Sequence, residues 1–145
     1  MRFYLDEKAR QNGVTPLCAP APGDAGYDIR SQEHVLIYPG EQAIVATGLY
    51  VEIPPGYVGI LKDRSSLAQI GLRTAAGVID SSYRGEIRIL VDNRGLAPVT
   101  INVNDRIVQM VVVPCYTDAA VPVDTLAGLT ATNRGAGGFG STGSQ

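Results

Sequence analysis

Residues 77–86 have the sequence GVIDSSYRGE, and this stretch decides how the rest of the chain is interpreted. Runs of β-branched residues, which favour strands, lie on both sides of its centre. Asp80, Ser81 and Ser82 favour turns because their side chains hydrogen-bond to nearby backbone groups. The pattern predicts a β-hairpin that carries Asp80 and Tyr83 together at its tip. A turn with no function could have the same composition, so other parts of the chain must distinguish the two interpretations.

Short β-type segments recur along the chain and are separated by Pro, Gly and Asn. At this spacing they predict an all-β sandwich or barrel rather than alternating strands and helices. One short helix is expected, capped by Asp63 and ending at Gly71. The predicted strands are residues 2–5, 25–29, 35–38, 43–53, 57–61, 78–79, 87–91, 99–103 and 106–113.

The composition is that of one ordinary globular domain. The chain has 145 residues, of which 45% are hydrophobic and 18% charged. A formal net charge of −2 provides no general positive field for long nucleic acids, so a phosphate-bearing partner would have to be bound locally. Apart from Lys8 and Lys62, the 12 basic residues are arginines, whose planar guanidinium suits phosphate oxygens.

The remaining composition predicts an intracellular protein in a reducing environment. Cys18 and Cys115 have no second Cys or His at ligand spacing, which favours reduced thiols and argues against a zinc site. His34 precedes an apolar run and is interpreted as structural. Residues 1–8 are too charged for a signal peptide, and no apolar run has membrane-spanning length. Neither a membrane nor a nucleic acid is therefore expected as a partner.

Residues 126–145 differ from the predicted β-domain of residues 1–125. They are rich in glycine and poor in apolar residues, which is typical of a frayed, flexible tail. This Gly-rich C-terminal arm nevertheless contains a cation, an aromatic ring and hydroxyl groups at Arg134, Phe139, Ser141 and Thr142. Free backbone N–H groups, a guanidinium, hydroxyls and a flat ring are what a nucleotide clamp requires.

A second phosphate-binding candidate lies at the start of the predicted helix. Arg64, Ser65 and Ser66 occupy its first turn, where free N–H groups and the helix dipole favour an anion. Plain helix capping explains the same three residues without a ligand. Gln109 is a polar residue inside an apolar strand, and it either faces outward or serves a site.

Five segments, taken together and in order, resemble the motifs of the trimeric deoxyuridine triphosphatase (dUTPase) family. The resemblance implies a jelly-roll-like distorted barrel, a homotrimer with active sites built from several chains, and Mg²⁺ as cofactor. It also implies the hydrolysis of dUTP to dUMP and pyrophosphate, which keeps uracil out of DNA and supplies dUMP for dTMP synthesis. The segments are residues 25–29 (AGYDI), 64–68 (RSSLA), 77–86, 105–109 (DRIVQ) and 134–143 (RGAGGFGSTG).

The resemblance further implies roles for individual residues. Asp80 would be the general base that activates water for attack on the α-phosphorus. Tyr83 would pack against the deoxyribose and exclude a ribose hydroxyl. Asp28 would contact Mg²⁺ through water. The implied substrate-binding residues are Arg64, Ser65, Ser66, Thr74, Gly77, Val78, Ile79, Asp80, Tyr83, Arg88, Gln109, Arg134, Phe139, Gly140, Ser141 and Thr142.

Some positions depart from the family pattern. Thr74 stands where many members have an Asn that contacts the base, and a hydroxyl cannot make the two-point contact of an amide. Asn104 replaces a usual Gly, and Val108 replaces a usual Ala. Arg88 aligns with a position sometimes implicated in substrate contact, although a solvent-facing strand residue is the alternative interpretation.

Two other functions are compatible with much of the sequence. A dCTP deaminase shares the fold and much of the site, and a non-catalytic regulatory trimer could retain a nucleotide pocket. The close match from Asp80 to Tyr83 and the complete arm motif favour the hydrolase. Ammonia release from dCTP would distinguish the deaminase.

Overall fold

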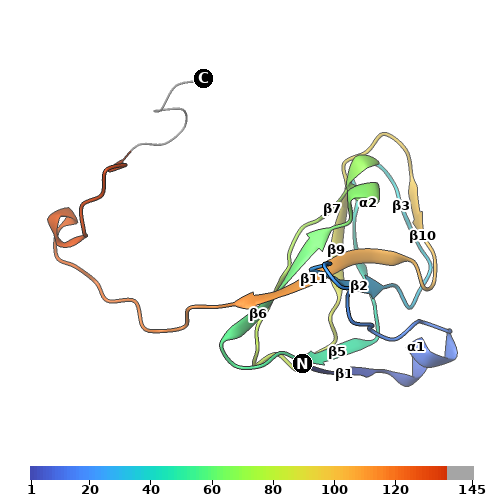
Figure 1. Cartoon of the computed structure of the whole chain (residues 1–145). Helices are drawn as coiled ribbons and strands as arrows, with labels where there is room; N and C mark the ends of the chain where they lie inside the picture. The colour runs from blue at the N-terminus through green and yellow to red at the C-terminus, as the bar shows by residue number, and fades with distance from the viewer. Residues whose placement is uncertain (137–145) are drawn as a thin grey trace.

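The computed structural model describes residues 1–136, which form mainly β-strands (Figure 1). Two short α-helices, α1 (Glu7–Gln11) and α2 (Ser65–Gln69), and a 3-10 turn, η1 (Leu126–Gly128), complete the described elements. The strands are β1 (Arg2–Leu5), β2 (Tyr27–Arg30), β3 (Val35–Ile37), β4 (Gln42–Val45), β5 (Leu49–Glu52), β6 (Tyr57–Asp63), β7 (Leu72–Thr74), β8 (Val78–Ile79), β9 (Ile89–Asn93), β10 (Val99–Ile101) and β11 (Arg106–Pro114).

The strands form small antiparallel sheets around a common core. One sheet has the order β2-β11-β6-β8 and another β4-β9-β7, while β1 pairs with β5 and β10 with β3. Side chains alternate along each strand, as in β11, where Val108 and Met110 are buried and Gln109 is exposed. Branched aliphatic side chains dominate the core, among them Ile29, Ile37, Val45, Ile53, Ile87, Ile89, Val91, Ile101 and Ile107. This architecture fits the predicted all-β, jelly-roll-like fold.

The predicted strand over residues 43–53 is wrong, because the chain turns between β4 and β5. Gly48 has a φ of +64°, in the left-handed region that favours glycine. A Cβ added at Gly48 would lie 2.6 Å from the Cβ of Ala9 in α1. Helix α1 itself was not predicted, although Asp6 caps it by accepting a 2.7 Å hydrogen bond from the N–H of Ala9.

The predicted hairpin between residues 78–79 and 87–91 is also wrong. Strand β8 pairs with β6, whereas β9 pairs with β4 and β7. The N–H of Ala75 donates to the carbonyl of Leu90 at 3.0 Å, which extends the pairing of β7 with β9. Residues 76–88 are therefore a wide connection that leaves one sheet, adds β8 to the other, and returns.

The predicted helix exists at α2, but Asp63 does not cap it. The N-cap residue is Arg64, which makes no side-chain capping bond. Asp63 still belongs to β6, and its carboxylate accepts a 2.7 Å hydrogen bond from the N–H of Thr74 in β7. It thereby joins the end of β6 to the start of the wide connection.

The backbone conformation of Asn104 explains why this residue can stand where the family pattern usually has a glycine. Its φ is +70°, and it is the one non-glycine residue with a positive φ in the described part of the chain. Asn tolerates this conformation better than most side chains, so it can replace a glycine in the turn before β11. Its side-chain oxygen also accepts a hydrogen bond from the N–H of Thr15 at 2.9 Å.

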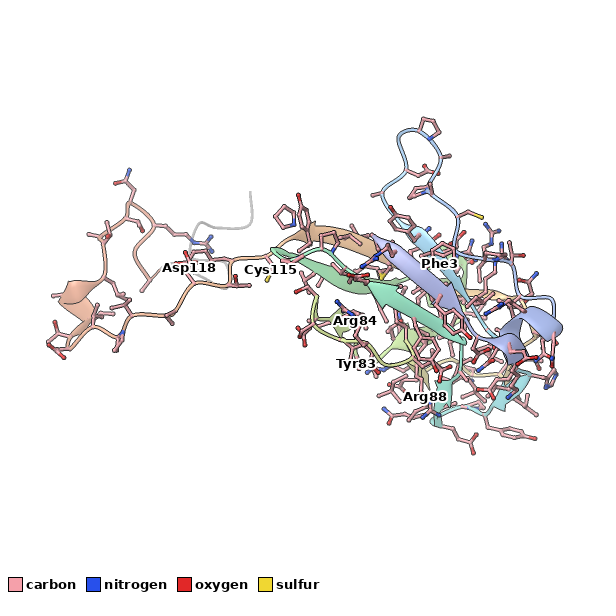
Figure 2. All side chains as sticks on the ribbon, turned by 90° about the horizontal axis from the view of Figure 1, so that it is seen from below. Phe3, Tyr83, Arg84, Arg88, Cys115 and Asp118 are labelled. Atoms are coloured by element: carbon pink, nitrogen blue, oxygen red, sulfur yellow. The ribbon has the colours of Figure 1, made fainter. Side chains whose placement is uncertain are left out.

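After β11 the chain leaves the body and extends well away from it (Figure 1). The N–H of Cys115 still bonds to the carbonyl of Gly56 at 2.9 Å, while Asp118 already lies outside the body (Figure 2). The predicted division into residues 1–125 and an arm from 126 remains a prediction. Among the described residues, none of the helices has the length and apolarity needed to cross a membrane.

Candidate active site

A cavity of about 270 Å³ lies between β8 and the returning part of the wide connection. It brings together six of the predicted site residues. Tyr83 and Arg88 come from the same side of the body, with Arg84 beside Tyr83 (Figure 2). The cavity is lined by Leu61, Ala76, Gly77, Val78, Ile79, Asp80, Tyr83, Glu86, Ile87, Arg88 and Leu90.

Strand β8 presents a free backbone edge beside this cavity. It is the edge strand of its sheet, and Ile60 of β6 lies opposite Val78. The N–H of Leu61 donates to the carbonyl of Gly77 at 2.8 Å. Because bonded and non-bonded pairs alternate in antiparallel sheets, the N–H and C=O of Val78 point away from β6. They can recognise a ligand with one donor and one acceptor on the same edge.

Close packing explains the glycine at position 77. A Cβ added there would lie 3.1 Å from both the Cβ and the carbonyl oxygen of Leu61. A larger residue would push β8 away from β6 and displace the free edge of Val78. Gly77 therefore acts through backbone position rather than through a side chain.

Asp80 and Tyr83 lie at the two ends of a tight turn. The N–H of Tyr83 donates to the carbonyl of Asp80 at 3.1 Å. The Arg84 guanidinium closes this turn by donating to the carbonyls of Ser81 and Tyr83, each at 2.7 Å. The Asp80 carboxylate is exposed and faces the cavity that it lines, so water can reach it.

A second group of predicted residues gathers on the outer face of the four-stranded sheet. Asp28 of β2 lies opposite Gln109 of β11, which in turn lies opposite Lys62 of β6. Nε of Arg64 is 3.2 Å from Oδ1 of Asp28, and Nη1 of Arg106 donates to Oδ2 at 3.1 Å. Two guanidinium groups thus hold one carboxylate and leave excess positive charge. We call this group the Asp28 surface, and it is formed by Asp28, Lys62, Arg64, Arg106 and Gln109.

The two groups do not face one cavity in a single chain. Leu61 lines the cavity and is followed by Lys62, so their side chains point to opposite faces of the sheet. Asp28 on β2 is also separated from β8 by three strand spacings, about 14 Å. None of Asp28, Arg64 or Gln109 lines the cavity in the described part of the chain. A nucleotide held by both groups would have to lie between two chains.

Known proteins resemble this chain in both fold and sequence. A family model described as dUTPase matches residues 14–143. The chain belongs to the dUTPase family. The match confirms the resemblance inferred from the five motifs and covers the cavity as well as the Asp28 surface.

Curated relatives and solved structures place the whole chain in this family. The deoxyuridine 5'-triphosphate nucleotidohydrolase of Anaeromyxobacter sp. (strain Fw109-5) is 46% identical over 124 residues, 83% of this chain and 82% of that one. The relative of the same name from Solibacter usitatus (strain Ellin6076) is 39% identical and covers 94% of this chain and 93% of its own. The dUTPase of Staphylococcus bacteriophage 80alpha with dUPNHPP is 28% identical, with a TM-score of 0.86 and coverage of 99% and 98%. The dUTPase likeness confirms the jelly-roll-like fold class.

One solved relative points to magnesium, and Asp28 is the residue that the sequence predicts beside it. A mutant dUTPase from phage phi11 of S. aureus, 28% identical over 86% of this chain and with a TM-score of 0.76, has a title describing a structural Mg(II) ion. Mg²⁺ usually retains several waters and takes one or two carboxylates. Oδ1 of Asp28 is buried 3.2 Å from Nε of Arg64 and accepts no hydrogen bond in the described part of the chain, so a metal-bound water would reach it only if Arg64 moved aside. In residues 1–136 no cluster of three His, Cys, Asp or Glu side chains could hold a metal by itself.

The other predicted residues of this dUTPase-family chain lie around these two groups. Ser65 and Ser66 are exposed in the first turn of α2, and Thr74 ends β7 with its N–H bonded to Asp63. Arg134 is exposed in the segment that leaves the body. The predictions for Phe139, Gly140, Ser141 and Thr142 fall outside the described residues.

Sequence reasoning missed two residues that shape the site. Arg106 binds Asp28, and its place in the DRIVQ segment beside Gln109 was the available signal. Glu86 lines the cavity as the last residue of the GVIDSSYRGE stretch. Its three hydrogen-bond donors lie 38 to 54 residues earlier in the chain, so the local sequence could not reveal them, and its one local ion pair is with Arg88 at 4.0 Å.

Proposed function

We propose that this protein hydrolyses dUTP to dUMP and pyrophosphate. One observation carries the proposal: a single cavity combines the free backbone edge of Val78, the ring of Tyr83 and the carboxylate of Asp80. These three groups suit a base, a sugar and an attacking water, respectively. The sequence relatives named as nucleotidohydrolases support the same reaction.

Recognition of uracil uses the backbone of β8. The uracil ring has an N–H donor beside carbonyl acceptors, which the N–H and C=O of Val78 can complement. Gly77 and Ile79 hold this edge in place through their pairing with β6. Because the backbone supplies the contacts, Thr74 does not need to replace the amide found in many family members. Tyr83 packs against the deoxyribose, where its ring leaves no room for a 2′-hydroxyl.

Chemistry begins when the Asp80 carboxylate accepts a proton from a water molecule. The oxygen of that water attacks the α-phosphorus, and the bond to the bridging oxygen on the opposite side breaks. The products are dUMP and pyrophosphate. Arg64, Ser65, Ser66 and Gln109 hold the phosphates, and Arg64 offers a planar fork for their oxygens. Mg²⁺, when bound, would neutralise charge on the phosphate oxygens, and Asp28 would hold its water shell.

A homotrimer supplies the complete site. The cavity and the Asp28 surface lie on different faces of one sheet, so the phosphates of a nucleotide seated on β8 must be held by a neighbouring copy. The arm, with Arg134, Phe139, Gly140, Ser141 and Thr142, closes over the nucleotide. The product dUMP then serves dTMP synthesis inside the cell, and removal of dUTP keeps uracil out of DNA.

The decisive experiment measures pyrophosphate release from dUTP, dTTP, dCTP and UTP, with and without Mg²⁺. We expect rapid turnover of dUTP alone, and only with the metal. Ammonia release from dCTP would instead identify a deaminase. Tight dUTP binding without any turnover would identify a non-catalytic nucleotide-binding trimer.

A further inference from the structure

The carboxylate of Glu86 ties the wide connection to a turn in a different part of the fold. Its Oε1 accepts hydrogen bonds from the backbone N–H groups of Thr47 and Gly48, each at 2.9 Å, and from Nε2 of Gln32 at 3.3 Å. Ile87 continues this attachment, since its N–H donates to the carbonyl of Leu49 at 2.7 Å. Charge-assisted bonds to two consecutive N–H groups make a strong, directional anchor.

The backbone of the same residue positions the ring of Tyr83. The Tyr83 hydroxyl donates to the carbonyl of Glu86 at 2.9 Å. Gly85 lies directly against this ring, because a Cβ added there would collide with the hydroxyl oxygen and with Cζ of Tyr83. The ring therefore rests on the backbone of Gly85 and Glu86.

These contacts connect residues 47–48 to the Tyr83 ring through Glu86. The turn at Thr47 and Gly48 holds the Glu86 carboxylate, Glu86 fixes the adjoining backbone, and that backbone fixes the Tyr83 ring. The turn from Asp80 to Tyr83 is held separately by Arg84, which donates hydrogen bonds to the Ser81 and Tyr83 carbonyls. Loss of the Glu86 carboxylate would thus release the support beneath the ring while leaving the Asp80 turn intact.

We propose that Glu86 is a positioning residue for sugar discrimination: its carboxylate holds the Tyr83 ring where it excludes a 2′-hydroxyl. The proposal rests on the proposed function of this cavity as the deoxyribose site. It assigns to Glu86 a role separate from the chemistry of Asp80. A ring that can shift by a fraction of an ångström would admit the ribose that it otherwise rejects.

The test compares the kcat/KM ratio for dUTP over UTP in wild type, Glu86→Ala, Glu86→Gln and Gly85→Ala. We expect the ratio to fall about tenfold or more in Glu86→Ala, since tenfold corresponds to only about 1.4 kcal/mol of differential binding. Glu86→Gln keeps one acceptor oxygen, so its ratio should lie between those of wild type and Glu86→Ala. Gly85→Ala retains the anchor but displaces the ring, so it should also lower the ratio.

Glu33→Gln is the matched control. Glu33 accepts a 2.7 Å hydrogen bond from the N–H of Ala46 and so supports the same turn as Glu86, but it contacts neither Tyr83 nor the cavity. We expect an unchanged ratio in this variant, even if its melting temperature falls. A folded Glu86→Ala or Glu86→Gln protein with the wild-type ratio would overturn the proposal. An equal loss in Glu33→Gln would do the same, because it would reduce the effect to general stability.

A binding measurement separates this proposal from the proposed function. Calorimetric affinities for dUMP and UMP report sugar discrimination without requiring hydrolysis. If wild type binds dUMP over UMP but does not hydrolyse dUTP, the proposed reaction fails while the role of Glu86 remains measurable. If the variants keep the wild-type preference for dUMP, the positioning role fails whatever the activity.

Discussion

At the scale of single residues, Asp80 and Glu86 are two carboxylates of one cavity with different constraints. Glu86 accepts three hydrogen bonds, whereas the exposed Asp80 carboxylate accepts none in the described part of the chain. A carboxylate whose oxygen is already engaged by several donors is committed to those contacts, while an exposed one without such contacts can bind a water molecule. This difference supports the proposed roles of Asp80 as the base and of Glu86 as a positioning residue.

Replacing Asp80 by Asn tests this assignment. The amide keeps the shape of the side chain but cannot accept the proton, so kcat should fall by roughly two to four decades. Affinity for dUTP should be nearly retained, because the proposed contacts of β8 with the base and of Tyr83 with the sugar remain. Pyrophosphate release and calorimetry measure the two effects. Turnover near the wild-type rate would remove Asp80 from the mechanism.

At the scale of elements, Asp63 fastens β6 to β7 where the wide connection begins. Partial burial acts to raise the pKa of Asp63, but the backbone N–H of Thr74 and the Arg73 guanidinium outweigh it and hold the pKa below its ordinary value. A carboxylate with a depressed pKa stabilises the fold above its unfolded pKa of about 4. That stabilisation is lost as the pH falls through the folded pKa.

Asp63→Asn should therefore destabilise the protein at neutral pH and matter less in acid. The difference in urea midpoint between wild type and variant should begin to shrink below about pH 4 and vanish as the pH falls through the lower folded pKa of Asp63, where the wild-type carboxylate becomes protonated. Both proteins must be compared at one concentration, because an oligomer's stability depends on it. Asp118→Asn, on the exposed segment beyond β11, is the control. A midpoint difference that is independent of pH would contradict the role of the charge.

Element by element, the sequence predicts strands better than it predicts their partners. Alternation is local, so β6, β10 and β11 were found within a few residues of their bounds. Pairing is not local, and the sequence of β8 does not reveal that β6, rather than β9, lies beside it. The break between β4 and β5 depends on α1, almost forty residues earlier, where Ala9 meets Gly48.

The candidate site shows the same limit. Residues whose chemistry is evident in the sequence, such as Asp80, Tyr83 and Arg64, can be proposed as site residues from motifs that span a few positions each. Glu86 and Arg106 act through bonds to residues 38 to 78 positions away, and these contacts exist only in the folded chain. Support residues are thus harder to predict than the groups that they support.

At the scale of the whole molecule, we expect a homotrimer in solution. The cavity and the Asp28 surface occupy opposite faces of one sheet, so the proposed site that uses both needs a second chain. Light scattering at micromolar concentration should give three times the mass of the chain, 15.3 kDa. A monomer at that concentration would contradict the proposed site, which needs the cavity of one chain and the Asp28 surface of another.

Truncation after Thr132 separates folding from closure over the substrate. The removed residues contribute little apolar surface, so the body should assemble with nearly the same melting temperature. Loss of the proposed Phe139 stack alone should cost roughly 1–3 kcal/mol. We expect this loss chiefly in kcat, because the arm would close on a nucleotide already seated at β8. Steady-state kinetics that match the full chain would show that these residues have no part in catalysis.

The opposite placement of the cavity and the Asp28 surface also has a genetic consequence. An Asp80→Asn chain keeps an intact Asp28 surface, and an Arg64→Ala chain keeps an intact cavity. Each homotrimer should be nearly inactive. A mixed trimer, however, contains an interface where the intact cavity of one chain meets the intact Asp28 surface of the other. Co-expression of the two inactive genes should therefore restore dUTP hydrolysis through interallelic complementation. A chain with both substitutions, co-expressed with either single variant, should restore nothing.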